Sequence, residues 1–209
     1  MQQLLLELAP PPPPTLENFC PGGNGAAIKA LRDALGGGER FVFLWGPGGS
    51  GKTHLLRAFA AAGAAAGLEV ATADDVARLD DPGQIALFDL CNRLRASKGA
   101  LAASAGAPPA RLALRPDLRS RLASGIVLQL RPLSDADKAA ALLERALERG
   151  MALDRDLIAY LLTHFDRDMG TQIAVLDALD RYSLQRKRAI TLPLLKEALR
   201  SLAAPEADA

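Results

Sequence analysis

The residues with the clearest chemical meaning form a glycine-rich loop that ends in Lys-Thr: Gly46, Pro47, Gly48, Gly49, Ser50, Gly51, Lys52 and Thr53. Their order is the G-x-x-x-x-G-K-T spacing of a phosphate-binding P-loop. Because glycine has no Cβ, the backbone N–H groups of such a loop can surround phosphate oxygens. Lys52 would reach the outer phosphates as a point charge, and the Thr53 hydroxyl would bind Mg²⁺.

The flanks of the loop support this interpretation. Residues 40–45 are an apolar run of strand length, and residues 54–60 are predicted to form the first turns of a helix. A helix that begins near Lys52 would add its positive dipole end to the phosphate site. A structural glycine turn is the competing explanation, but the spacing and both flanks favour the P-loop. We include His54 among the candidate nucleotide-binding residues. The imidazoles of His54 and His164 have no metal-ligand partners at suitable spacing and are interpreted as structural.

A second candidate site is the acidic pair Asp74-Asp75, which follows a short predicted strand over residues 68–73. Acidic residues at the carboxyl end of a strand in a P-loop protein are candidates for the Walker B motif. Asp74 would orient the water shell of Mg²⁺, and Asp75 would polarise an attacking water. The same pair could instead cap the helical turn that follows it. The sequence leaves both interpretations open.

The elements that must position these residues alternate between strands and helices as far as residue 131. Strands are predicted over 40–45, 68–73, 99–106 and 126–130, and helices over 26–35, 52–66, 82–95 and 111–123. Such alternation behind a P-loop predicts a parallel sheet covered on both faces. From residue 132 the pattern is wholly helical, and four helices are predicted. The expected fold class is therefore α/β, with a P-loop parallel sheet, flanking helices and a small all-α lid.

The predicted domain organisation has four parts. They are a tail with a proline linker over 1–15, a P-loop nucleotide-binding domain over 16–131, a helical lid over 132–203 and a disordered tail over 204–209. Residues 1–8 are rich in leucine and are followed by an unbroken proline run from Pro10 to Pro14. Proline runs form semi-rigid spacers. The tail is therefore either a partner-binding segment held away from the body, or a disordered terminus, or a strand docked on its own domain.

The composition limits the class of protein. Hydrophobic residues make up 49% of the 209 residues but aromatic residues only 4%, so the core must be mostly aliphatic. The formal net charge of +1 gives no electrostatic reason to expect a strong nucleic-acid binder. Cys20 and Cys91 show no disulfide pattern, which fits a reducing compartment. No run reaches the length of a membrane span and no signal peptide is visible, so we expect a cytoplasmic protein without membrane contact.

Several segments, in register along nearly the whole chain, resemble the Hda family of AAA+ proteins, the regulatory inactivators of the replication initiator DnaA. The similar segments are 3–8 (QLLLEL), 19–24 (FCPGGN), 88–93 (FDLCNR), 116–122 (PDLRSRL), 130–135 (LRPLSD) and 176–181 (LDALDR). A P-loop α/β domain followed by a helical lid is also the layout of AAA+ ATPases in general. The resemblance is interrupted by one gap, between the P-loop helix and the acidic strand.

The resemblance implies specific roles. It implies that the tail, through Gln3, Leu4, Leu6 and Leu8, docks on the DNA polymerase sliding clamp (β subunit). It also implies that Arg121 is an arginine finger that acts in trans on DnaA-bound ATP, where it would stabilise charge in the transition state. DNA would be reached only through the loaded clamp, and self-association into a homo-oligomer is left open. The chain's own ADP or ATP, with Mg²⁺, would mainly set its shape.

Three departures from the family pattern bear on catalysis. The family carries another strand and helix between the P-loop helix and the acidic strand, whereas this chain runs almost directly from Ala66 to Asp74. The missing strand would lie at the edge of the sheet, so we expect the core to survive. The polar sensor-1 position is Gly106, with Ser104 as the nearest polar residue, and the sensor-2 arginine position is Gly170. We therefore expect weak or no intrinsic ATPase activity.

Two other functions compete with the regulatory one. A P-loop ATPase of the helicase-loader type, acting on DNA, would assemble into a ring and show DNA-stimulated hydrolysis; the lost sensor residues and near-neutral charge count against it. A replication initiator would need a helix-turn-helix after the lid. The sequence shows none after residue 203, so we do not expect an initiator.

Overall fold

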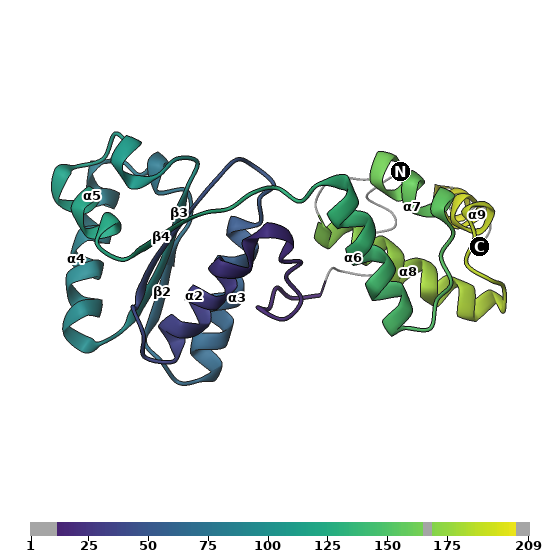
Figure 1. Ribbon diagram of the computed structural model, residues 1–209, viewed down its shortest axis with the longest axis horizontal. Helices are drawn as coiled ribbons and strands as arrows, with labels where there is room; N and C mark the ends of the chain where they lie inside the picture. The colour runs from purple at the N-terminus through teal and green to yellow at the C-terminus, as the bar shows by residue number, and fades with distance from the viewer. Residues whose placement is uncertain (1–11, 165–168, 204–209) are drawn as a thin grey trace, which may run out of the picture. The chain divides into compact units, whose positions relative to one another are not determined.

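A computed structural model describes residues 12–164 and 169–203, with side chains described as far as Glu197. The described residues divide into two compact units, Pro13–Pro132 and a second that begins at Leu133. Figure 1 shows the first unit as a sheet flanked by helices and the second as a group of helices.

The first unit is built on a four-stranded sheet in the order β2-β3-β1-β4. The strands are β1 (Phe41–Trp45), β2 (Val70–Ala73), β3 (Ala100–Ala105) and β4 (Ile126–Gln129). Every pairing is parallel. The predicted α/β fold with a parallel sheet is therefore confirmed, and all four strands direct their carboxyl ends to one edge of the sheet.

Helices cover both faces of this sheet (Figure 1). One face carries α2 (Gly25–Leu35) and α3 (Lys52–Ala65), which bury Leu31 and Phe59 against the sheet. The other carries α4 (Asp81–Ser97) and α5 (Pro116–Ala123), with Leu94 and Leu118 in a second core. Strand β3 is completely buried, because small side chains such as those of Ala102 and Ala103 let the helices approach closely on each side.

The chain passes directly from α3 to β2, and among the described strands β2 pairs with β3 alone. This confirms the expectation that an edge strand is missing. The four residues of β2 make a short exposed edge, and short edges limit unwanted strand pairing.

One predicted helix begins later than expected. Instead of a helix from residue 111, a 3₁₀ turn covers Pro109–Arg111 and α5 begins at Pro116. The residue before a proline avoids the helical conformation, and Arg115 accordingly has φ −51° and ψ 138°. Leu112 and Leu114 alternate into the core in the extended stretch between them. Their alternate spacing is a strand-like signal that the helical interpretation missed.

The second unit contains α6 (Asp135–Glu148), α7 (Arg155–His164), α8 (Met169–Arg186) and α9 (Leu192–Ala203). A capping box begins α6: the Ser134 side chain accepts from the Asp137 N–H, and the Asp137 carboxylate accepts from the Ser134 N–H, both at 3.1 Å. The hydrogen bonds from Ser134 also lower the pKa of Asp137. The core between the helices is aliphatic, centred on Leu142, Leu161 and Leu176.

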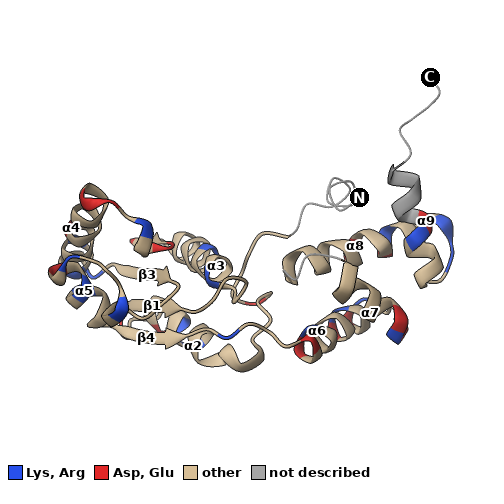
Figure 2. Ribbon diagram, turned by 90° about the horizontal axis from the view of Figure 1, so that it is seen from above, with Lys and Arg blue, Asp and Glu red and all other residues tan. Residues whose placement is uncertain are grey.

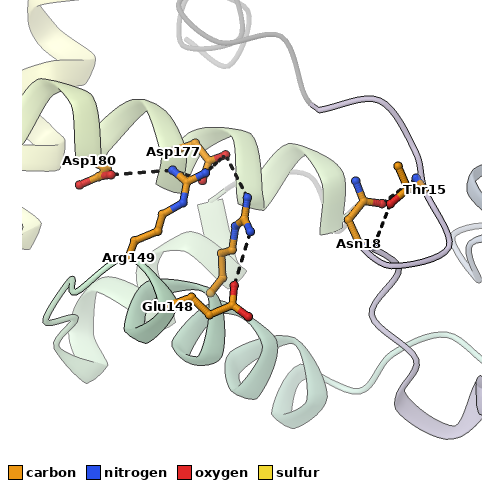
Figure 3. A network of polar contacts seen from close by, with 7 residues as sticks. Thr15, Asn18, Glu148, Arg149, Asp177 and Asp180 are labelled. Carbon is orange, nitrogen blue, oxygen red and sulfur yellow. Dashed lines mark hydrogen bonds and ion pairs between the residues drawn. The ribbon is translucent and has the colours of Figure 1, made fainter.

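An ion-pair network ties α6 to α8 (Figure 3). Arg149 contacts both carboxylate oxygens of Asp177, at 2.9 and 3.1 Å, and Asp180 at 3.8 Å. Arg145 joins Asp177 to Glu148, at 3.9 and 3.5 Å. This gives Asp177, in the lid segment that carries the family resemblance, a structural role. In the described residues no helix is long and apolar enough to cross a bilayer.

Candidate functional site

The P-loop connects β1 to α3 at the carboxyl edge of the sheet, and its first residue is fixed by two neighbouring segments. The Gly46 N–H donates to the Ala105 carbonyl at 3.2 Å. A Cβ on Gly46 would lie 2.3 Å from the Leu130 carbonyl oxygen, which leaves no room for any other residue. Leu130 in turn donates to the Trp45 carbonyl at 2.7 Å. The start of the loop is therefore held by backbone groups at the end of β3 and directly after β4.

The far end of the loop is held by the segment before α2. Gly51 has φ +90°, and a Cβ there would lie 2.5 Å from the Phe19 ring. The Phe19 and His54 rings are 5.3 Å apart, and His54 Nε2 lies 3.1 Å from the Thr15 carbonyl. Thr15 and Asn18 exchange hydrogen bonds that shape this segment (Figure 3). The His54 imidazole thus packs on the chain itself, and its part in nucleotide binding stays a prediction.

The polar groups of the loop suit an anion. Lys52 donates from Nζ to the carbonyls of Gly46 and Pro47, at 2.8 and 2.9 Å, so the ammonium is folded over the loop. Ser50 is 4% exposed, and its hydroxyl has no hydrogen-bond partner among the described residues. These features fit a bound phosphate chain: the Lys52 ammonium, the unpartnered Ser50 hydroxyl and the glycines, which leave the backbone N–H groups accessible.

Thr53 and Asp74, predicted as Mg²⁺ ligands, are brought together. The Thr53 hydroxyl donates to Asp74 Oδ2 at 2.6 Å, and the Ser104 hydroxyl donates to Asp74 Oδ1 at 2.5 Å. Partial burial raises the pKa of Asp74, but the hydrogen bonds from Ser104 and Thr53 outweigh it and hold that pKa below its usual value. An ionised carboxylate beside a threonine hydroxyl is a donor set that fits Mg²⁺.

Asp75 is directed differently from Asp74. Its backbone is left-handed, with φ +46°, and its carboxylate lies 2.7 Å from Arg78 Nε. The side chain makes no capping hydrogen bond to the short 3₁₀ helix Val76–Arg78 that follows. The alternative interpretation of this pair as a helix cap is therefore wrong. The predicted catalytic role of Asp75 stays a prediction, and in this structure its carboxylate is engaged by Arg78.

Arg121, the predicted finger, lies in the last turn of α5 and is half-buried (Figure 2 shows the basic residues on this helix). Its guanidinium stands 5.8 Å from the centre of the Phe88 ring. No carboxylate among the described residues pairs with it, whereas Arg115, directly before the same helix, pairs with Asp117 at 3.2 Å. Burial raises the pKa of the Cys91 thiol, although Arg95 and Arg121 act against this. The role of Arg121 as an arginine finger stays a prediction.

Some predicted positions contribute less. Gly106 follows β3 and is exposed, and Gly170 is the second residue of α8; neither offers a side chain to a nucleotide. The predicted clamp-binding residues Gln3, Leu4, Leu6 and Leu8 lie outside the described residues. Sequence reasoning missed two supports of the loop, the Phe19 ring and the Leu130 carbonyl. It also missed the bond from Ser104 to Asp74, which the adjacency of β2 and β3 could have suggested.

Comparisons with known proteins agree on the class. Residues 135–199 match the family model described as "Hda, lid domain". The chain is similar to a crystal structure of a DNA replication initiation factor, with 25% identity and a TM-score of 0.64 over 84% of this chain and 68% of that one. AMPPCP-bound DnaA from Aquifex aeolicus is 23% identical with a TM-score of 0.65, over 84% of this chain and 70% of that one. Domain III of Thermotoga maritima DnaA is 20% identical with a TM-score of 0.66, over 93% of this chain and 98% of that one.

The sheet, the P-loop and these relatives define a DnaA-related AAA+ protein. Residues 135–199 match the lid of the Hda family, and the chain is consistent with that family. The resemblance inferred from the sequence is confirmed at this level.

Proposed function

We propose that this chain is a clamp-tethered regulator that promotes hydrolysis of ATP bound to DnaA and supplies Arg121 in trans. The observation that carries the proposal is the state of Arg121. Its guanidinium is half-buried against Phe88 and is not neutralised by a carboxylate of the described chain. By contrast, the surface side chains of Arg93 and Arg78 pair with Glu69 and Asp75.

Arg121 would act on charge that develops in another protein's site. A guanidinium beside the γ-phosphate stabilises the charge of the phosphoryl-transfer transition state, and arginine fingers accelerate such reactions by about 10³ to 10⁵. Packing on the Phe88 ring restricts the side chain, so less conformational freedom is lost when it meets the phosphate. This cation lies in the last turn of the short helix α5.

The chain's own P-loop would hold ADP or ATP. Residues 46–54 would surround the phosphates, and Lys52 would exchange its two carbonyl partners for phosphate oxygens. Thr53 and Asp74 would hold Mg²⁺, which neutralises phosphate charge when bound. The similar DnaA from Aquifex aeolicus is bound to AMPPCP, which supports nucleotide binding by this chain.

Weak or no intrinsic turnover follows from the same site. Asp75, the candidate for polarising water, is paired with Arg78. Gly106 and Gly170 stand where the family has polar and cationic sensors, so two contacts to the γ-phosphate are absent from the sequence. The bound nucleotide would then stabilise this chain's shape, while the chemistry takes place on DnaA.

The tail would provide the tether. Gln3, Leu4, Leu6 and Leu8 would occupy a groove of the sliding clamp, and the proline run would hold them away from the domain. Tethering raises the effective concentration of Arg121 near DnaA on the same DNA, because the second contact becomes intramolecular.

The test is an ATP-turnover assay that mixes this protein, DNA-loaded clamp and DnaA. Wild-type protein should accelerate hydrolysis only with loaded clamp present, and deletion of residues 3–8 should abolish both clamp capture and acceleration. The deletion should leave the thermal unfolding of the protein unchanged. Equal acceleration without the tail would contradict the tether. Rapid DNA-stimulated hydrolysis by the protein alone would instead favour a motor of the helicase-loader type.

A further inference from the structure

Ser104 occupies a position that the proposed reaction does not use. It lies on β3 between β2 and β1, and its side chain is completely buried. The register pairs Ala73 with Ala103 on one side and Leu44 with Ser104 on the other. Ser104 therefore sits one residue beyond the last pair with β2, beside Asp74, and one strand away from the start of the P-loop.

The single hydroxyl of Ser104 makes two hydrogen bonds of opposite sense. It donates its hydrogen to Asp74 Oδ1 at 2.5 Å and accepts the Asp75 N–H at 3.2 Å. Because a hydroxyl has one hydrogen, Ser104 has no further hydrogen to donate to another group. The other oxygen of Asp74 accepts from Thr53 at 2.6 Å, so the carboxylate is held at both ends.

The bond to the Asp75 N–H has a separate effect on the backbone. Asp75 has φ +46°, a left-handed conformation that non-glycine residues seldom adopt without support. With that turn in place, the Asp75 carboxylate meets Arg78 instead of sharing the position of Asp74. One buried serine thus contacts both the Asp74 carboxylate and the backbone of the turn that separates the two carboxylates.

We propose that Ser104 is a positioning residue of the nucleotide site, which fixes Asp74 for Mg²⁺ and holds the Asp74-Asp75 turn, without touching the nucleotide. The inference rests on the nucleotide binding in the proposed function. Ser104 lies two residues before Gly106, the position at which the family pattern has a polar sensor of the nucleotide. A residue that contacts the γ-phosphate would affect ATP alone. A residue that acts through Asp74 should affect ADP and ATP equally, and only when Mg²⁺ is present.

The test measures the dissociation constants of fluorescent ADP and ATP, each with Mg²⁺ and with EDTA, on the full-length protein. For Ser104→Ala, we expect the gain in affinity from Mg²⁺ to fall about tenfold for both nucleotides, as for other residues that orient metal ligands. Affinity in EDTA should not change. Ser120→Ala, which removes an exposed hydroxyl from α5, is the control and should behave as wild type.

The separate variant Ser104→Thr should retain the gain in nucleotide affinity from Mg²⁺, because threonine keeps the hydroxyl. If Ser104→Ala does not fold, as judged by its thermal transition, Ser104→Cys provides the same comparison with a much weaker donor. An unchanged gain from Mg²⁺ in a folded Ala or Cys variant, or a loss confined to ATP, would overturn this inference alone. Wild-type protein that bound neither nucleotide would overturn both the inference and the nucleotide-binding part of the proposed function.

Discussion

At the scale of single residues, Lys52 and Arg121 are cations in two different environments. Lys52 is folded onto the carbonyls of Gly46 and Pro47 and stays inside the chain's own loop. Arg121 has an aromatic ring beneath it and no carboxylate partner in the described chain. The first arrangement is suited to a ligand that enters the loop, and the second to a group presented from outside. This division underlies the proposal that binding and chemistry take place on different proteins.

Lys52→Ala tests the first half of that division. The variant loses charge-assisted hydrogen bonds to phosphate that contribute about 3 kcal/mol, so the dissociation constant for ADP should rise about a hundredfold. The nucleotide-free protein should unfold at nearly the same temperature, since Lys52 is part-exposed. Arg57→Ala, an exposed cation on the same helix, is the matched control and should bind ADP as wild type does. Equal binding by both variants would show that ADP does not occupy this loop.

At the scale of elements, the P-loop depends on a segment far from it in the sequence. Phe19 packs where a Cβ of Gly51 would lie, and the Thr15 carbonyl meets the His54 ring nitrogen. Asn24, after the same segment, exchanges two hydrogen bonds of 2.8 Å with the backbone of Arg131. These contacts explain why the segment resembling FxPGxN is part of the domain: it closes over the beginning of α3 and joins the chain that leaves β4.

Gly51→Ala measures the strength of this support. The new methyl group meets the Phe19 ring at 2.5 Å, and alanine disfavours φ +90°. We expect the free energy of unfolding in urea, without nucleotide, to fall by about 1–3 kcal/mol. Gly48→Ala changes the same loop at a position where an added methyl group would have no atom within 4 Å, and it should cost no more than about 0.5 kcal/mol. Equal losses at the two positions would contradict the bracing role of Phe19.

How far the sequence predicted these elements depends on how local each signal was. The P-loop strand and helix follow from residues 40–60 alone, because spacing and apolar pattern lie in one stretch. The beginning of α5 was predicted wrongly from helical spacing. Pro116 and the alternation of Leu112 and Leu114 keep residues 112–115 out of the helix. Ser104 was seen as a polar residue, but its bond to Asp74 depends on strand pairing across 30 positions. Bracing of the loop by Phe19 is likewise a tertiary contact.

At the scale of the whole molecule, the chain combines a domain that lacks an edge strand with a helical unit that matches the Hda lid model. The loss leaves β1, β3 and the P-loop intact, because β2 and not β1 lies at that edge. The glycines at the sensor positions weaken the case for turnover in this chain's own site. Neither change affects α5, which carries Arg121. The molecule therefore keeps the parts that would hold a nucleotide and the part that would act on a partner.

The most direct test of this account is the rate at which ATP already bound to DnaA is hydrolysed on a DNA-loaded clamp. Labelled ATP is bound to DnaA and free nucleotide is removed before wild-type protein, Arg121→Ala or Arg119→Ala is added. Arg119 is also half-buried on α5 and serves as the matched control. The account predicts that Arg121→Ala lowers the stimulated rate by about 10³-fold while clamp capture and ADP binding remain unchanged, and that Arg119→Ala behaves as wild type. Stimulation by Arg121→Ala at the wild-type rate would contradict it.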